Sequence, residues 1–148
     1  MALAVHTTPA AQPVVRISPA SALRIATVGA RLLFGLMFLV IGIDGFLHFI
    51  PMPEEPMSDG AMAFGGALFQ TGYMFPLIMG TQALCGALLV LNRKVPLALL
   101  ILAPVVVNIF AFHYFLTPNE LGMSIGIVLV HLYLAWSYRS AYRALLAS

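Results

Sequence analysis

Asp44 and His48 lie near the end of an apolar run and have the residue types and the spacing to handle a proton. They belong to the stretch GIDGFLHFIPMPEEP, residues 42–56, and are four residues apart. In a helix, that spacing places two side chains on one face. A carboxylate and an imidazole in contact can pass a proton to or from a redox partner such as a quinone. The alternative interpretation is a structural pair that joins this helix to its neighbours by hydrogen bonds.

Four further polar side chains lie inside other apolar runs: Gln82, Asn108, His113 and His131. An ionisable group at membrane depth costs roughly 2.5–3.5 kcal/mol, so it normally faces other helices and finds a partner there. We therefore predict a ligand-binding pocket with Asp44 and His48 on its wall and these four as surrounding polar contacts. Asn108 and His113 are five residues apart and diverge by about 140°, so not all of the six can face one point. The pocket is expected to open away from the cytoplasm, with the PMPEEP loop and the short interfacial helix expected after it as a lid. Asn108 has a competing interpretation as an interhelical hydrogen-bonding residue.

His48 and His113 also raise the possibility of a cofactor site. Both are predicted near the same membrane surface, on different helices, which would suit a haem held by two imidazoles or a metal ion. A single histidine on each helix is a weak signal for a ligand set. We rank haem and metal binding below a quinone-like ligand, and no metal site is assigned.

The composition places these residues in a membrane. Of 148 residues, 61% are hydrophobic and only 8% are charged, and the mean hydropathy is +1.00. Soluble domains carry about a quarter charged residues. Four apolar stretches are long enough to cross a bilayer, at about 27–50, 73–91, 95–116 and 121–138. The predicted fold is all-α: a four-helix transmembrane bundle. The stretch AMAFGGALFQTG predicts a short interfacial helix between the first two spans.

Charge predicts the topology. The basic residues precede the first span, separate the second from the third, and follow the fourth, whereas Glu54, Glu55, Asp59 and Glu120 occupy the other two loops. The positive-inside rule then places both termini in the cytoplasm. Residues 1–23 are expected to form a flexible cytoplasmic tail and residues 24–148 a single membrane domain. No basic cluster with interleaved aromatic residues suggests a nucleic-acid partner.

Motifs of soluble enzymes are missing from the sequence. It contains no Gly-rich phosphate loop, no C-x-x-C pair, no H-E-x-x-H and no G-x-S-x-G. No catalytic residue is assigned beyond the candidate pair Asp44 and His48, and whether the protein is an enzyme stays open.

Several strings resemble a known family. LLFGLMFLVIGIDGFLHFIPMP, TGYMFPLI, LAPVVVNIFAFHYFLTP and LYLAWSYRSAYRALL are similar to the DoxX family of small four-helix proteins of the bacterial inner membrane. The similarity covers about residues 31–146. Some members of the family are linked to oxidoreductase complexes, and the related DoxD type is a subunit of a thiosulfate:quinone oxidoreductase. Several relatives have Asn at the position of Asp44 and Glu at the positions of Gln82 and His131.

These observations predict a function. We expect an accessory or redox-linked component of the inner membrane that binds a quinone-like or other small apolar molecule, with the lipid bilayer and other membrane or redox subunits as partners. A non-catalytic scaffold or assembly factor is the alternative. A small transporter ranks lower, because no repeat of broken helices is visible.

Overall fold

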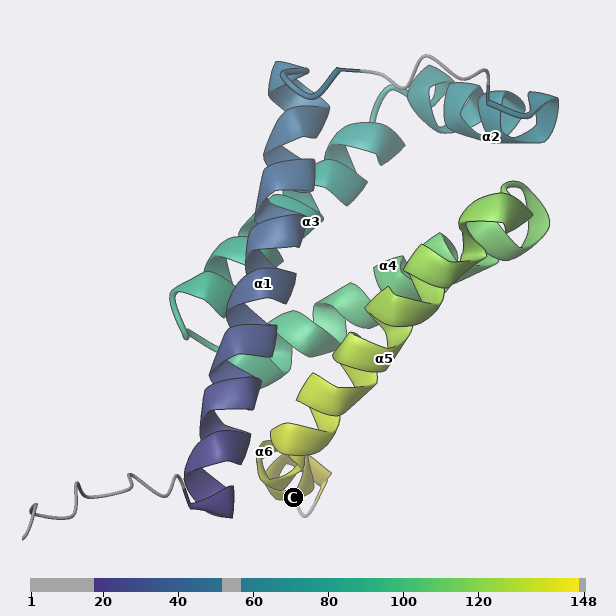
Figure 1. The fold of residues 1–148 in the computed structure, drawn as a ribbon. Coiled ribbons are helices and arrows are strands. Elements are labelled where there is room, and N and C mark those ends of the chain that lie inside the picture. Colours follow the sequence, from purple (N-terminus) through teal and green to yellow (C-terminus); the bar gives the residue numbers. More distant parts are fainter. Residues whose placement is uncertain (1–17, 52–56, 147–148) are drawn as a thin grey trace, which may run out of the picture.

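The computed structural model describes residues 18–51 and 57–146, and this part of the chain contains helices and no strands (Figure 1). The predicted all-α class is confirmed. In chain order the elements are α1 (Pro19–Leu47), α2 (Asp59–Gln70), α3 (Met74–Val90), α4 (Val95–Phe115), the 3₁₀ turn η1 (Pro118–Glu120), α5 (Leu121–Ser137) and α6 (Arg139–Leu146).

The long first helix begins and ends at local signals. Ser18 is its N-cap, with a side-chain oxygen that accepts a hydrogen bond from the Ser21 N–H, and Pro19 occupies the first helical position. At the other end His48 adopts left-handed backbone angles, with φ of 50°, and the helix stops. The helix therefore begins inside the range expected for the tail and ends three residues before the expected limit of the first span. Residues 1–17, the rest of the expected tail, lie outside the described residues.

The closest packing in the fold is between α1 and α3. Gly42 and Gly86 permit it, because a methyl group on Gly42 would overlap the backbone of Ala83, and one on Gly86 would overlap the backbone of Leu39. The fully buried core side chains extend this contact toward α4 and α5. They are Phe38, Cys85, Leu89, Ala98, Leu102 and Leu134.

The helices define two ends of the molecule. The start of α1 and the helix α6 lie together at one end, and α2 lies at the other end, level with the last turns of α1 and above the reversal between α4 and α5 (Figure 1). We call these the α6 end and the α2 end. A hydrogen bond of 2.9 Å from the Tyr142 hydroxyl to the Pro96 carbonyl ties α6 to the first turn of α4. The sequence predicted a basic tail there and missed its helical conformation.

The lengths of the helices agree with a membrane location. Among the described residues, three segments are long and apolar enough to cross a bilayer: α1, α4, and η1 with α5. A fourth span results if α2 and α3 are counted as one element, although they meet at a bend of 92°. The predicted second, third and fourth spans agree with α3, α4 and α5 to within a residue at each end.

Candidate functional site

The six predicted site residues do not form one cluster of interacting side chains. Asp44 and His48 lie at the α2 end of α1, Gln82 on α3, Asn108 and His113 on α4, and His131 on α5. Their side chains form no hydrogen bond or ion pair with one another. The one link between two of them joins backbone groups, the His48 N–H and the Asp44 carbonyl, at 2.7 Å.

Asp44 acts on the end of its own helix. Its carboxylate Oδ1 accepts a hydrogen bond of 2.7 Å from the backbone N–H of Ile50 and so holds the turn that follows α1. His48 is exposed, and its left-handed conformation removes it from the helical face that Asp44 occupies. Spacing by four residues brings side chains together only where both residues are helical. The predicted contact between the two side chains is therefore not formed.

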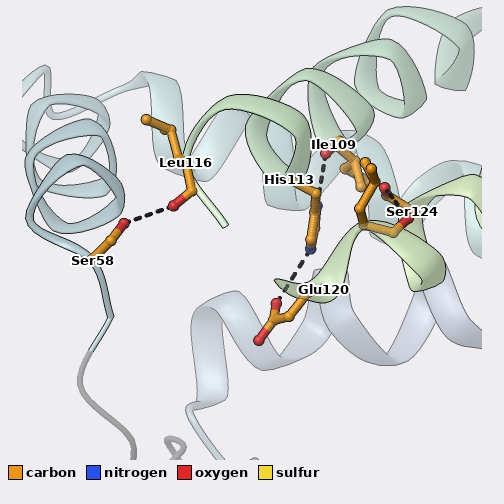
Figure 2. Close-up of polar contacts among 7 residues, drawn as sticks. Ser58, Ile109, His113, Leu116, Glu120 and Ser124 are labelled. Carbon is orange, nitrogen blue, oxygen red and sulfur yellow. Dashed lines mark hydrogen bonds and ion pairs between the residues drawn. The ribbon is translucent and has the colours of Figure 1, made fainter. Parts of the chain in front are cut away.

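An acid and an imidazole do meet, at another place. His113 Nε2 lies 3.5 Å from Glu120 Oε2 across the reversal between α4 and α5 (Figure 2). The other ring nitrogen, Nδ1, lies 2.7 Å from the carbonyl of Ile109, so Nδ1 carries the proton and donates it. The His113 side chain is 10% exposed and that of Glu120 is 62% exposed. A largely buried imidazole therefore lies against an exposed carboxylate at the α2 end.

The sequence-based prediction missed Glu120 as a partner, because it counted Glu120 only as a loop charge. The signal available was Pro118, because a proline is favoured in the first turn of a helix. A proline at that point begins the tight turn η1, and the turn brings the carboxylate back over the last turn of α4.

A second contact at the α2 end attaches α2 to α4. The hydroxyl of Ser58, the N-cap of α2, donates a hydrogen bond of 2.8 Å to the carbonyl of Leu116 (Figure 2). The same oxygen accepts from the N–H of Ala61. The rings of Phe64 and Phe112 lie 5.6 Å apart and extend the contact. The PMPEEP segment, expected to form a lid, includes residues 52–56, which lie outside the described residues.

Gln82 and Asn108 differ in their surroundings. Gln82 is buried on α3, beside the close contact with α1. Asn108 is exposed on α4, although the sequence predicted that it would face inward. It therefore does not line a pocket together with Gln82.

His131 lies in the half of the fold toward the α6 end. It is 8% exposed, and its Nδ1 is buried with no hydrogen-bond partner among the described residues. On one side the ring contacts Phe34, with 5.9 Å between ring centres. On another side it lines a cavity of about 240 Å³ between α4, α5 and α6, together with Leu99, Ala103 and Tyr142.

A larger apolar crevice lies between α1 and α5. Its volume is about 510 Å³, and small or flexible side chains on both helices line it: Ala30, Leu33, Phe34, Met37, Met123, Gly126, Ile127 and Val130. None of these is polar, so the crevice can hold a hydrocarbon chain and offers no hydrogen bond from its walls. Phe34 lies between this crevice and His131.

A buried arginine also lies toward the α6 end. Arg31 is 6% exposed, and its guanidinium donates a hydrogen bond to the carbonyl of Leu89 in the last turn of α3. A cation at the carboxyl end of a helix compensates the free carbonyls and the helix dipole. Arg31 thus stabilises the end of α3 and is not counted as a ligand group.

The histidines do not form a metal site in the described part of the chain. No group of three or more His, Cys, Asp or Glu side chains is placed to hold a metal ion there. Both ring nitrogens of His113 already have partners. A haem ligand would have to break one of these contacts, and the geometry therefore gives the bis-imidazole interpretation no support.

Comparison with known proteins adds no further constraint. No family model, no curated protein and no solved structure matches this chain. The resemblance to the DoxX family therefore rests on the sequence strings that suggested it.

Proposed function

We propose that this chain is a DoxX-like protein of the bacterial inner membrane in which α1, α3, α4 and α5 cross the bilayer as a four-helix bundle. In this topology α2 lies in the interface and both termini are cytoplasmic. Support comes from the charges: Arg24, Arg93 and Arg139 flank helix ends on the side of α6, and Asp59 and Glu120 lie at the α2 end. With 17 residues, α3 is about 25 Å long, close to the hydrocarbon thickness of a bilayer.

We further propose that the protein binds a quinone-like or other small apolar molecule and serves as an accessory component of a membrane redox complex. The observation that carries this proposal is that the His131 ring lines an apolar cavity while its Nδ1 has no hydrogen-bond partner among the described residues. A buried polar atom without a partner is rare in native structures and costs about 1–3 kcal/mol. Because this atom is enclosed, a ligand carbonyl or hydroxyl in the cavity would reach it once the imidazole ring turns toward the cavity.

The chemistry of the cavity restricts the class of ligand. Its walls are almost entirely apolar, with the imidazole of His131 as the polar group, while the Tyr142 hydroxyl already donates to Pro96. Such a site favours a flat, mostly apolar ring with one or two hydrogen-bonding oxygens, which describes a quinone. This location replaces the outward-facing pocket expected from the sequence, because Asp44 and His113 already have local partners.

A photoreactive short-chain quinone provides the test. The protein is purified, placed in quinone-free lipid nanodiscs and titrated with the probe, and the labelled peptides are mapped by mass spectrometry. We expect saturable labelling of α4, α5 and α6 around His131. Replacing the ring by one without nitrogen, His131→Phe, removes one hydrogen bond in an apolar site and should raise the half-saturating concentration about 5- to 30-fold.

His48→Phe is the matched control, because it makes the same chemical change at an exposed histidine at the other end of α1. It should leave the titration unchanged. Labelling that does not saturate would contradict binding at this site, and so would an equal half-saturating concentration in the wild type and His131→Phe.

A scaffold or assembly factor remains the second candidate, and a specific observation favours it. The side chains of Asp44 and Ser58 both bond to backbone atoms at helix ends, as expected of residues that fix the positions of helices. Copurification followed by mass spectrometry distinguishes the two functions. A scaffold would copurify with protein partners and without a bound quinone, and the same partners would copurify with the His131→Phe variant.

A further inference from the structure

The outer face of α4 carries an amide where only apolar groups are expected. Asn108 lies six residues after the fully buried Leu102, so the two side chains point about 120° apart around the helix. Asn108 is exposed and has no hydrogen-bond partner among the described residues. It lies about 10 Å from the end of α4 at Phe115 by the helical rise, well inside the apolar segment.

The rest of this face is apolar and unpartnered. It consists of Leu97, Leu100, Ile101, Pro104 and Val107, all of which are exposed. Pro104 adds a second unusual feature, because a proline inside a helix has no N–H for the carbonyl four residues earlier. The bond to the carbonyl of Leu100 is therefore missing from the helix ladder on the same face. In a bilayer no water is present to satisfy either group.

The chemistry of the amide identifies what covers this face. An asparagine side chain both donates and accepts hydrogen bonds, so it is complementary to another copy of itself. Two copies of one membrane protein insert with the same orientation, because the same charges direct both. A two-fold axis normal to the membrane then brings residue 108 of one copy to residue 108 of the other at the same depth. A buried Asn is known to fix register and oligomeric state at helix interfaces in this way.

We propose that the exposed face of α4 is the interface of a parallel homodimer, with the two Asn108 amides hydrogen-bonded to each other at its centre. The proposal rests on the proposed membrane topology and is independent of any ligand. Pro104 four residues before the amide and Ala111 three residues after it are compact, so the two α4 helices can approach closely there.

Cysteine crosslinking in native membranes tests the geometry. The single native cysteine, Cys85, is removed as Cys85→Ala, and Asn108→Cys is introduced. Leu129→Cys is the matched control, since Leu129 is exposed on α5 and lies about as far from the α2 end of its helix. On mild oxidation we expect a disulfide-linked dimer of twice 15.9 kDa for Asn108→Cys and only monomer for Leu129→Cys. Equal crosslinking of the two variants, or a crosslink to a different protein, would overturn the proposal.

Dissociation of the dimer tests the role of the amide and keeps the proposal testable if the cysteine variant does not fold. The monomer–dimer equilibrium of the full chain is measured in detergent micelles by analytical ultracentrifugation. Asn108→Val should raise the dissociation constant about 5- to 30-fold, whereas Asn108→Gln, which retains the amide, should change it less. A wild-type protein that is monomeric at every concentration, or an unchanged dimer in Asn108→Val, would reject the interface. Neither readout depends on quinone binding, so the two proposals can fail separately.

Discussion

His113 and Glu120 face each other across the reversal between α4 and α5, with 3.5 Å between His113 Nε2 and Glu120 Oε2 (Figure 2). The imidazole of His113 also donates a hydrogen bond from Nδ1 to the carbonyl of Ile109. One ring thus links the last turns of α4 to the turn that begins α5. The contact is half open to water, because Glu120 is largely exposed. When the imidazole is protonated, its contribution to stability should accordingly be that of a surface ion pair, not of a buried one.

A double-mutant cycle measures this contribution. Glu120→Gln, His113→Phe and the double variant should give a coupling free energy of about 0.2–1 kcal/mol, and the coupling should shrink between low and high salt because the carboxylate is screened. The free energy of unfolding in detergent is the measurement. A coupling energy independent of salt, or one well above about 1 kcal/mol, would show that the pair is more deeply enclosed than its exposure indicates.

Asp44 should behave as a helix-terminating residue. Asp44→Ala removes the acceptor for the Ile50 N–H and should lower the free energy of unfolding by about 1 kcal/mol, while Asp44→Asn, which retains an acceptor oxygen, should cost less. His48→Ala should change stability by less than about 0.5 kcal/mol, since the side chain is exposed. Thermal unfolding in detergent distinguishes these variants. A cost for His48→Ala equal to that of Asp44→Ala would instead revive the predicted pair.

The contact between α1 and α3 should tolerate no added side chain at Gly42. Gly42→Ala would place a methyl group onto the backbone of Ala83, and overpacking of this kind costs typically about 1–3 kcal/mol. The control, Gly29→Ala, is on the same helix and meets open space. It should leave stability unchanged or raise it by up to about 1 kcal/mol, because glycine is a poor helix former. Equal effects of the two substitutions in an unfolding measurement would argue against the close approach.

The docking of α6 should weaken at alkaline pH. Burial raises the pKa of the Tyr142 phenol above its usual value of about 10. Below about pH 10 the phenol is neutral in both the folded and the unfolded chain. As pH rises further, the unfolded chain loses the phenolic proton first, so the free energy of unfolding falls until pH passes the folded pKa. The charged phenolate also cannot donate to the carbonyl of Pro96.

Tyr142→Phe should remove this alkaline loss and should cost about 1 kcal/mol at neutral pH, the contribution of one hydrogen bond. Tyr73→Phe is the control, because Tyr73 is exposed and should retain the wild-type pH dependence. The comparison requires unfolding curves at pH 8 and at pH 11. An alkaline loss that persists in Tyr142→Phe would assign the titration to another group.

The sequence by itself determined α3, α4 and α5, whereas it missed the early start of α1 and the helix α6. Runs of about 20 apolar residues and a proline at position 96 or 118 act on the chain next to them, so the ends of α3, α4 and α5 could be predicted to within a residue. What it could not determine was which polar side chains meet. That depends on whether a helix continues to the second residue of a pair, as it does not at His48, and on how a turn folds back, as η1 does to bring Glu120 to His113. It depends also on the rotation of each helix about its axis, which packing between helices sets. That rotation turned His131 inward and Asn108 outward, although the sequence surrounds both with the same apolar residues.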